Sequence, residues 1–419
     1  MIPKKKLIKV VISIIILIFI IIIISIFFLD KKPHFIKLYL KKILPDRIID
    51  VGKVLLHEEN RKYLENNYNT LFFPELQFNT VHYKKIKLNF NQNNINNFFD
   101  DNWKTFFIET YEDNIFIFYK NNIYVSLISD VKNNKFSKIK TNLPSVPLGI
   151  YLNKGEIYAS IVTSRNSCEY LTIIKAKLNF QEINFKTIKT FDECSKNIRS
   201  GKIQSIEINN KLYFLVSTAA EIRANIDYYD IKPQKDDSIF GKILLLDELN
   251  GKYNIYSSGH RNILGLYADK NIILASEHGP KGGDEINKIL FEGNYGWPIA
   301  SYGDYYNPKS DSLNYKKNHE DYNFEEPIFS FVPSIAPSEI IRLDNNFSEK
   351  WQDSFLLGSL NSKHLFRIKF NKKFEKVIFY EKIFIGERIR DLKYDKKNKL
   401  IFLALENSGS LGILSTKKF

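Results

Sequence analysis

The most informative stretch of the chain, residues 259–298, reads GHRNILGLYADKNIILASEHGPKGGDEINKILFEGNYGWP. Polar, charged and turn-forming residues surround one short apolar segment, residues 271–276. The glycines indicate places where the backbone approaches another group closely, and they are Gly279, Gly282, Gly283, Gly293 and Gly296. Carboxylates at Glu277, Asp284 and Glu285 accompany the guanidinium group of Arg261. This combination is typical of a site that holds an anionic ligand together with a hard cation.

The order of residues in this stretch resembles the glucose/sorbosone dehydrogenase family, the soluble quinoprotein sugar dehydrogenases that use pyrroloquinoline quinone (PQQ) and calcium. The family shares the segments GHRN-x-x-GL, EHGP-x-GGDE-x-N and GNYGWP, which stand here at residues 259–266, 277–287 and 293–298. A match in three segments at this spacing is far more specific than a lone glycine motif. Residues 200–217, 329–340 and 387–414 are also similar to family segments. The likeness is good from about residue 200 to 419 and weak from 76 to 199.

Short apolar strands recur from residue 76 onwards, and each follows a turn rich in Asn, Lys, Gly or Asp. The clearest are residues 123–128, 157–162, 212–217, 272–277, 355–360 and 400–405. Six similar units predict an all-β radial repeat, a β-propeller, although their spacing is irregular. The family resemblance implies six blades, and we expect this six-bladed β-propeller to occupy residues 76–419.

The N-terminal part of the chain has the pattern of a membrane anchor. Residues 10–29 are apolar and uncharged, which is long enough for a transmembrane helix. No small-residue cleavage site follows them, so we expect an uncleaved anchor. Residues 1–9 form a basic cytoplasmic tail in this interpretation, and residues 30–75 form a basic, partly helical neck. The lysines before the span favour an anchor in a bacterial inner membrane with the propeller facing the periplasm, although basic residues also follow the span.

Charge and composition narrow the possible partners. The net charge is +14, and about half of the excess flanks the apolar segment, which suits a membrane surface and not a nucleic-acid groove. The hydrophobic content of 44% excludes a disordered chain. The two cysteines, Cys168 and Cys194, are either buried free thiols or a disulfide, and both alternatives stay open.

The resemblance also implies a set of cofactor-binding residues. PQQ is a planar tricarboxylate, and binding it requires cationic groups. The GHRN segment implies that Arg261 and Asn262 contact the cofactor, and the R-x-RD segment implies that Arg388 and Arg390 lie over it. Arg388 and Arg390 alternate along a strand and therefore share one face, where two like charges favour an anionic ligand. Arg261 could instead pair with a carboxylate in a blade loop.

Two calcium sites are implied in the same way. The backbone carbonyls of Gly279 and Pro280 would hold the calcium ion of the cofactor. A second calcium ion would lie near Glu285 and Tyr295, with Asp304 as a further candidate ligand. Carboxylate and carbonyl oxygens suit calcium and not zinc. The alternative is that Glu285 and Tyr295 hold an ion that is only structural.

The chain departs from the family where a catalytic base is expected. A general base must take the proton of the sugar hydroxyl while a hydride passes to the quinone, and the family uses a His ahead of an LYF-like strand. Here residues 196–206 read KNIRSGKIQSI, with Arg199 or Ser200 at that place, and arginine stays protonated. Asn361 replaces a family Lys in the same way.

Two functions therefore remain open. The first is a membrane-anchored PQQ-dependent dehydrogenase of a sugar or alcohol that passes electrons to a respiratory acceptor. The second is a non-catalytic, calcium-stabilised propeller that binds a carbohydrate or protein partner.

Overall fold

The computed structural model describes residues 81–88, 104–221, 231–304 and 315–417. The chain divides into two units, Met1–Asn69 and Thr70–Phe419, and all described residues belong to the second. The predicted tail, membrane anchor and neck, residues 1–9, 10–29 and 30–75, lie outside the described residues. Within the described ranges, no helix has the length and apolar character needed to cross a membrane.

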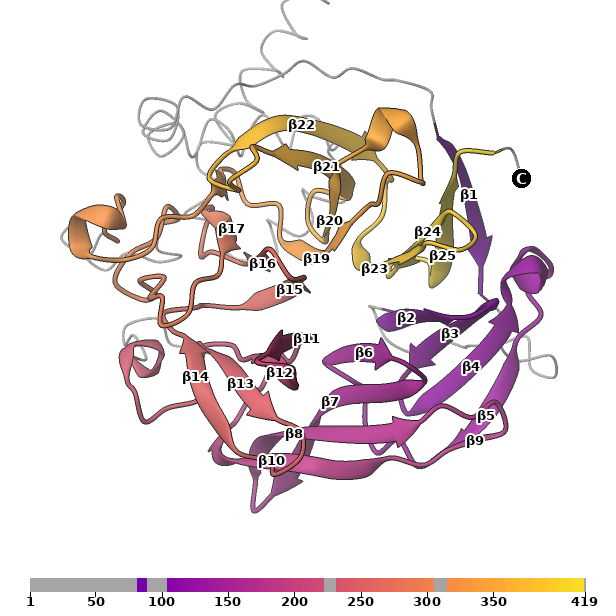
Figure 1. Cartoon of the computed structure of the whole chain (residues 1–419), viewed down its shortest axis with the longest axis horizontal. Coiled ribbons are helices and arrows are strands. Elements are labelled where there is room, and N and C mark those ends of the chain that lie inside the picture. Colours follow the sequence, from indigo (N-terminus) through magenta and orange to yellow (C-terminus); the bar gives the residue numbers. More distant parts are fainter. Residues whose placement is uncertain (1–80, 89–103, 222–230, 305–314, 418–419) are drawn as a thin grey trace, which may run out of the picture. The chain divides into compact units, whose positions relative to one another are not determined.

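The described residues form six antiparallel sheets arranged around one axis, which confirms the predicted six-bladed propeller (Figure 1). The innermost strands of the blades are β2 (Phe106–Tyr111), β6 (Gly149–Asn153), β11 (Ile203–Ile208), β15 (Ile263–Ala268), β19 (Pro337–Arg342) and β23 (Ile389–Asp395). The second strands are β3 (Asn114–Tyr119), β7 (Glu156–Arg165), β12 (Lys211–Ser217), β16 (Ile273–Glu277), β20 (Phe355–Ser359) and β24 (Leu400–Leu405). Five of the six apolar segments predicted from the sequence are such second strands.

The outer half of each blade completes the sheets. The third strands are β4 (Asn122–Leu127), β8 (Cys168–Lys177), β13 (Ile243–Asp247), β17 (Asp284–Lys288), β21 (His364–Phe370) and β25 (Ser410–Ser415). The outermost strands are β5 (Ser137–Thr141), β10 (Lys186–Ser195), β14 (Tyr253–Ser257), β18 (Phe329–Phe331), β22 (Val377–Phe384) and β1 (His82–Lys87). A short strand, β9 (Glu182–Ile183), adds to β5 in parallel. The described helices are short 3-10 turns: Ile128–Asn133, Lys232–Gln234, Glu320–Tyr322 and Glu349–Trp351.

The propeller is closed by strands from the two ends of the second unit. β1 pairs antiparallel with β25, from His82 opposite Ser415 to Lys87 opposite Ser410. The last blade therefore contains three C-terminal strands and one strand that precedes the first blade. This pairing protects the outer edge of β25, which would otherwise present unpaired backbone groups.

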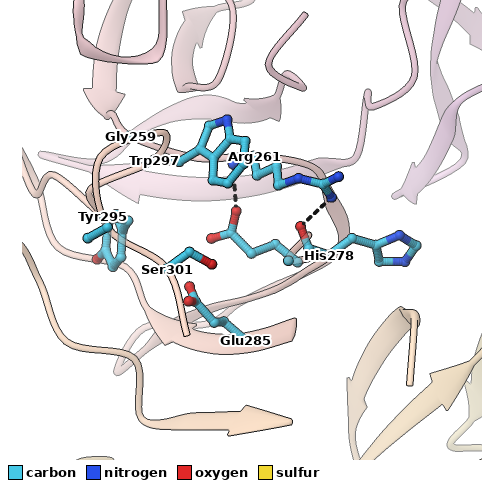
Figure 2. Close-up of a pocket in the computed structure, with 10 residues that line it drawn as sticks. Gly259, Arg261, His278, Glu285, Tyr295, Trp297 and Ser301 are labelled. Carbon is cyan, nitrogen blue, oxygen red and sulfur yellow. Dashed lines mark hydrogen bonds between the residues drawn. The ribbon is translucent and has the colours of Figure 1, made fainter. Parts of the chain in front are cut away.

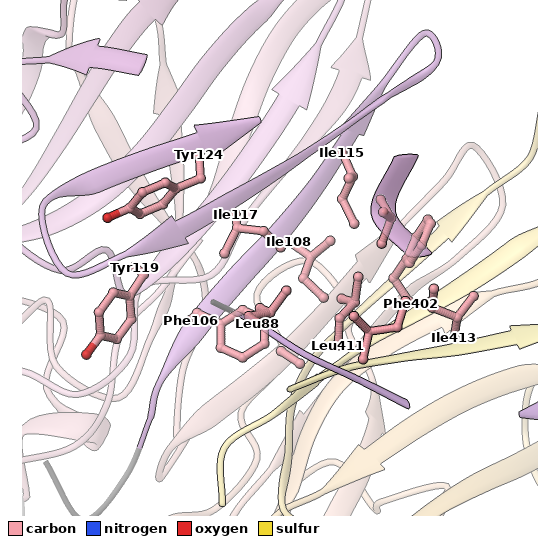
Figure 3. Close-up of a cluster of buried hydrophobic side chains, with 13 residues drawn as sticks. Leu88, Phe106, Ile108, Ile115, Ile117, Tyr119, Tyr124, Phe402, Leu411 and Ile413 are labelled. Carbon is pink, nitrogen blue, oxygen red and sulfur yellow. The ribbon is translucent and has the colours of Figure 1, made fainter. Parts of the chain in front are cut away.

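The hydrophobic core lies between neighbouring blades. One cluster joins Phe106 and Ile108 of the first blade to Phe402 and Leu411 of the last (Figure 3). Strand β24, with the sequence LIFLAL, is buried along almost its whole length because both faces of its sheet pack against another blade. The second strands therefore appear in the sequence as continuous apolar runs.

A disulfide joins Cys168 on β8 to Cys194 on β10, with 5.8 Å between the two Cα atoms. These strands are neighbours in the blade that starts with β6. The chain has no other cysteine, so the open alternative of two free thiols is excluded in this structure.

Candidate functional site

Three arginines gather where the inner strands β15 and β23 begin, and we call Arg261, Arg388 and Arg390 the arginine cluster. Arg261 lies two residues before β15, Arg388 directly precedes β23, and Arg390 is its second residue. The positive charges of all three act on the imidazole of His278, which places them around one side chain. The fold thus brings together two segments that are more than a hundred residues apart in the sequence.

A buried carboxylate holds two members of this cluster. Arg388 Nε donates to Glu406 Oε2 at 3.0 Å, and Arg390 Nε donates to Oε1 of the same carboxylate. The Thr105 hydroxyl donates to Oε1 at 2.7 Å, and the Glu406 side chain has no exposed surface. Burial alone would raise the pKa of Glu406, but the two arginines hold it below its usual value. Part of the anionic counterpart predicted for these arginines is therefore a residue of the chain itself.

Sequence reasoning missed Glu406. It directly follows the apolar strand β24, and a lone carboxylate at the end of such a strand was the available signal. Within the described residues, this one carboxylate is shared by two guanidinium groups.

Arg261 and Asn262 present polar atoms that nothing in the described chain satisfies. Arg261 Nη1 donates to the His278 carbonyl at 2.9 Å, and the guanidinium group lies 5.2 Å from the centre of the Trp297 ring (Figure 2). Arg261 Nε and Asn262 Oδ1 are both buried without a hydrogen-bond partner. Within the described ranges the Arg261 side chain forms no ion pair with a carboxylate, which argues against the alternative of a simple loop ion pair. Because buried polar atoms are nearly always paired, these two atoms indicate a polar ligand.

The two histidines of the motif differ in their surroundings. His260 is fully buried, with Nδ1 at 3.1 Å from Glu277 Oε1 and Nε2 at 2.9 Å from Ser257 Oγ, which agrees with a structural role. His278 Nε2 donates to the Pro337 carbonyl at 2.8 Å, and its ring points away from Glu285 (Figure 2). The positive charges of Arg261, Arg388 and Arg390 act on this ring. Burial, together with the neighbouring arginines, lowers the pKa of His278 to about 3, so this imidazole is neutral.

Asp284 fixes the loop that carries Gly279 and Pro280. Its carboxylate accepts hydrogen bonds from the Gly279 amide at 2.9 Å, the Ile335 amide at 2.7 Å and the Ala336 amide at 2.6 Å. A Cβ atom on Gly279 would overlap the carbonyl of Gly283, which explains the glycine at this position. Neither the Gly279 nor the Pro280 carbonyl accepts a hydrogen bond from another described residue, so both are available to a cation.

Glu285 lies beside a cavity of about 10 Å³, the space of about one water molecule or ion. Tyr295, Ser301 and Glu277 also line it (Figure 2). Burial raises the pKa of Glu285 to about 8, against the lowering effect of His319. Asn287 Nδ2 donates to Glu277 Oε1 at 2.7 Å and to Glu285 Oε2 at 3.2 Å. Two buried carboxylates this close together favour either a proton or a bound cation.

The other two ligands predicted for the second calcium ion, Tyr295 and Asp304, do not present their side chains to this cavity as free oxygen ligands. The Tyr295 hydroxyl donates to the Lys288 carbonyl and accepts from the Leu290 amide, so only the Tyr295 backbone carbonyl is available to an ion. Asp304 does not line the cavity, and its carboxylate lies 3.5 Å from Lys317 Nζ. The described residues contain no group of three or more His, Cys, Asp or Glu side chains suited to hold a metal ion. An ion beside Glu285 would therefore depend partly on backbone oxygens and water.

The positions proposed for the family base hold no proton acceptor. The Ser200 hydroxyl is buried, donates to the Ile263 carbonyl at 2.6 Å and lies 2.7 Å from Ser217 Oγ. Arg199 is exposed, and its Nε donates to Asn197 Oδ1 at 3.1 Å. Ser200 thus joins two blades, and Arg199 faces solvent.

Comparison with known proteins agrees with the motifs. The Glucose / Sorbosone dehydrogenase family model matches residues 150–413, which is more than half of the chain. The chain belongs to the glucose/sorbosone dehydrogenase family. The match begins well before residue 200, so it includes the blade of β6, β7, β8 and β10, in which the motifs are weak. Arg261, Arg388 and Glu406 all lie within the matched region.

Among members of this family, the chain is similar to aldose sugar dehydrogenase YliI of Escherichia coli, with 32% identity over 180 residues, 42% of this chain and 46% of that protein. It is also similar to the crystal structure of the soluble aldose sugar dehydrogenase of Escherichia coli in the apo form. The TM-score is 0.63 at 19% identity, covering 81% of this chain and 100% of that one. The PQQ-bound aldose sugar dehydrogenase of Streptomyces coelicolor has a TM-score of 0.56 at 18% identity, covering 80% and 98%. The chain spans less than half the length of the curated relatives that it matches first.

Proposed function

We propose that the chain is a PQQ-dependent dehydrogenase that oxidises a hydroxyl group of a sugar or another alcohol. The arginine cluster carries this proposal, because three guanidinium groups gather around one side chain. One of them, Arg261, has a buried Nε without a hydrogen-bond partner, next to the equally unsatisfied Asn262 Oδ1. A planar tricarboxylate supplies negative charge to this cluster and an acceptor to Arg261 Nε, whereas Asn262 Oδ1 requires a donor group on the ligand. The PQQ-bound state of the Streptomyces coelicolor dehydrogenase supports the choice of PQQ.

In this proposal, Arg261 and Asn262 contact PQQ through their free polar atoms, and Arg388 and Arg390 pair with its carboxylates. Glu406 orients the two arginines and is a positioning residue. The free carbonyls of Gly279 and Pro280 fit a calcium ion beside the cofactor. PQQ, when bound, would supply the hydride acceptor, and a calcium ion held by these carbonyls would polarise the quinone.

We assign a second calcium ion to the small cavity beside Glu285. The buried Glu277 and Glu285 carboxylates support this assignment, since a divalent cation would favour the ionised form of Glu285, whose pKa is raised by burial. The Tyr295 carbonyl would be a further ligand. Asp304 does not line this cavity, and we leave it out of the proposed set.

The hydroxyl proton needs an acceptor other than the family histidine. Arg199 and Ser200 cannot serve, because one stays protonated and the other already bonds two neighbours. We expect a carboxylate from a blade outside the matched region to take the proton, directly or through water.

Reconstitution of the full chain with calcium and PQQ tests the proposal. We expect PQQ to bind with a change in its absorbance, and aldoses or alcohols to reduce a dye acceptor. If calorimetry and absorbance detect no PQQ binding, the dehydrogenase proposal fails. PQQ binding without dye reduction by any aldose or alcohol would instead favour the second candidate.

The second candidate is a non-catalytic, calcium-stabilised propeller that binds a carbohydrate or protein partner. The fully bonded Ser200 hydroxyl and the exposed Arg199 favour it, since neither can act as a base. It accounts for the loop that carries Gly279 and Pro280, and for the cavity beside Glu285, without requiring a catalysed reaction. It does not account for the unpaired atoms of Arg261 and Asn262, and for that reason we place it second.

We also propose that residues 10–29 anchor the chain in a bacterial inner membrane, with the propeller in the periplasm and electrons passing to a respiratory acceptor. The uncharged apolar run supports the anchor, and the disulfide suits an oxidising compartment. Protease added to spheroplasts should digest the propeller. Protection of the propeller, or its recovery in the soluble fraction, would contradict the proposal.

A further inference from the structure

A second, larger cavity lies on the propeller axis. It measures about 280 Å³ and is lined by residues from the inner strands of all six blades. Its lining includes Arg342 and Tyr394, near the ends of β19 and β23, and none of the arginine cluster, which stands where the inner strands begin. The cavity is therefore a separate feature of the molecule from the candidate redox site.

Most charged groups of the cavity wall form ion pairs, whereas the exposed Lys396 forms none with a described residue. Lys202 Nζ lies 2.5 Å from Glu339 Oε2 and 3.7 Å from Asp391 Oδ1, and Lys393 forms an ion pair with Glu109. Four of these side chains are buried, with exposed fractions of 6–11%: Lys202, Glu339, Asp391 and Glu109. Asp391 Oδ2 also accepts the Ile108 amide at 2.8 Å.

An ion in this cavity would compete with pairs that already exist. An anion would find Lys202 and Lys393 already paired and would lie against three carboxylates, with the exposed Lys396 as the remaining lysine of the lining. A cation would find the carboxylates paired to lysines. No cluster of metal-binding side chains occurs within the described ranges. The charge arrangement therefore favours a neutral ligand.

The cavity nevertheless offers unused hydrogen-bonding groups. Lys202 donates one bond to Glu339, whereas an ammonium group has three donors. The Gln204 amide lines the cavity and bonds to no other described side chain, which leaves both a donor and an acceptor open. The hydroxyls of Tyr151 and Tyr267 bond to Ser205 and Asp269, so these tyrosines contribute mainly their ring surfaces to the lining.

Donors, acceptors and aromatic surfaces together suit a ligand with both hydroxyl groups and C–H faces. The volume is just below the range of about 300–1,000 Å³ that is typical of small-molecule pockets. We propose that this axial cavity binds a neutral polyhydroxylated molecule of about monosaccharide size. This site is independent of PQQ and lies outside the proposed redox function.

Calorimetry on the full chain without PQQ tests the inference, with D-glucose as the probe. Gluconate and glucosamine are charge controls of similar size. We expect saturable glucose binding with a Kd on the order of 1 mM and at least about tenfold weaker binding of both charged sugars. No saturable heat at about a hundredfold higher glucose, or equal binding of the three compounds, would overturn the proposal.

Variants then locate the bound sugar. Gln204→Leu should weaken glucose binding about tenfold or more, because it removes the open amide. Gln204→Glu should lose glucose and gain glucosamine, which keeps the test informative if the leucine variant folds poorly. Arg388→Ala should leave glucose binding unchanged. Binding that is lost in Arg388→Ala but retained in both Gln204 variants would place the sugar in the arginine cluster and refute the axial site.

Since PQQ is absent from these measurements, they are independent of the redox proposal. A chain that binds PQQ but no neutral sugar in the axial cavity would refute only the present inference, and the reverse result would refute only the dehydrogenase.

Discussion

At the scale of single residues, Glu406 has the largest effect on the candidate site. Its buried carboxylate accepts hydrogen bonds from Arg388, Arg390 and Thr105, and thereby joins the last blade to the start of β2. The Arg pair was predictable from the sequence, because alternation along a strand puts both side chains on one face. Their shared partner was not predictable, since Glu406 follows another strand, β24, and meets the arginines only through the register of β23 and β24.

We predict that Glu406→Ala lowers the free energy of unfolding by about 1–3 kcal/mol, because two partly buried guanidinium groups lose a common acceptor. Urea denaturation measures the change. Glu207→Ala is the matched control, since Glu207 is an exposed carboxylate on the inner strand β11, and it should change stability by no more than about 0.5 kcal/mol. PQQ should also bind the Glu406 variant less tightly, and equal stability and affinity in both variants would contradict the positioning role.

Glu109 gives a prediction about pH. Burial raises the pKa of Glu109 to about 7 from a model-compound value of 4.5. The folded state then holds a proton that the unfolded state has released, so this group makes stability fall as pH rises from about 4.5 to about 7. In Glu109→Gln this slope should become flatter, by at most about 1.4 kcal/mol per pH unit. Urea denaturation across this pH range provides the measurement, and identical slopes in the two proteins would refute the assignment.

At the scale of elements, the strands are where sequence and structure agree best. Apolar runs such as residues 212–217 and 400–405 predicted the second strands β12 and β24, because the pattern of a strand buried on both faces is local. The neighbouring inner and outer strands were less clear, since their mixed burial gives a weaker pattern. The pairing of the two cysteines was undecidable from the sequence, because it depends on β8 and β10 becoming neighbours.

The disulfide should stabilise the blade that it joins. Cys168→Ser with Cys194→Ser should lower the free energy of unfolding by about 2–4 kcal/mol, as is typical when a closed loop is released. Thermal unfolding with and without reductant measures this effect. Reductant should lower the melting temperature of the native chain and leave the double variant unchanged. A double variant as stable as the oxidised native chain would show that the bond contributes nothing.

At the scale of the whole propeller, closure depends on a strand that is far from its partners in the sequence. β1 supplies the outer edge of the last blade, and Ile86 and Leu88 join the core between the first and last blades. The range predicted for the propeller, residues 76–419, contains β1, but the aligned family region begins at residue 150, and no motif identified β1 as the strand that completes the last blade. Only the paired register with β25 does so.

Removal of β1 should therefore open the ring. A chain that begins at residue 89 loses Ile86 and Leu88, each of which contributes about 1.5–3 kcal/mol when buried, and it exposes the edge of β25. We expect a lower melting temperature and concentration-dependent association, measured by calorimetry and light scattering. A chain that begins at residue 70 is the control and should behave as a closed propeller. Equal melting of the two chains would refute the role of β1 in closure.

The sequence by itself determined the family and the β-rich architecture. It also identified Arg261, Arg388, Arg390 and the loop with Gly279 and Pro280 as candidate site residues. These features follow from local patterns, namely apolar runs, turn residues and contiguous motifs, which do not depend on distant contacts. Only the tertiary structure decided that Glu406 joins two arginines, that Cys168 pairs with Cys194, that β1 closes the ring, and that Lys202 and Lys393 pair with carboxylates of other blades. Each of these features depends on which residues, distant in the sequence, come into contact when the chain folds. No local sequence pattern specifies those contacts.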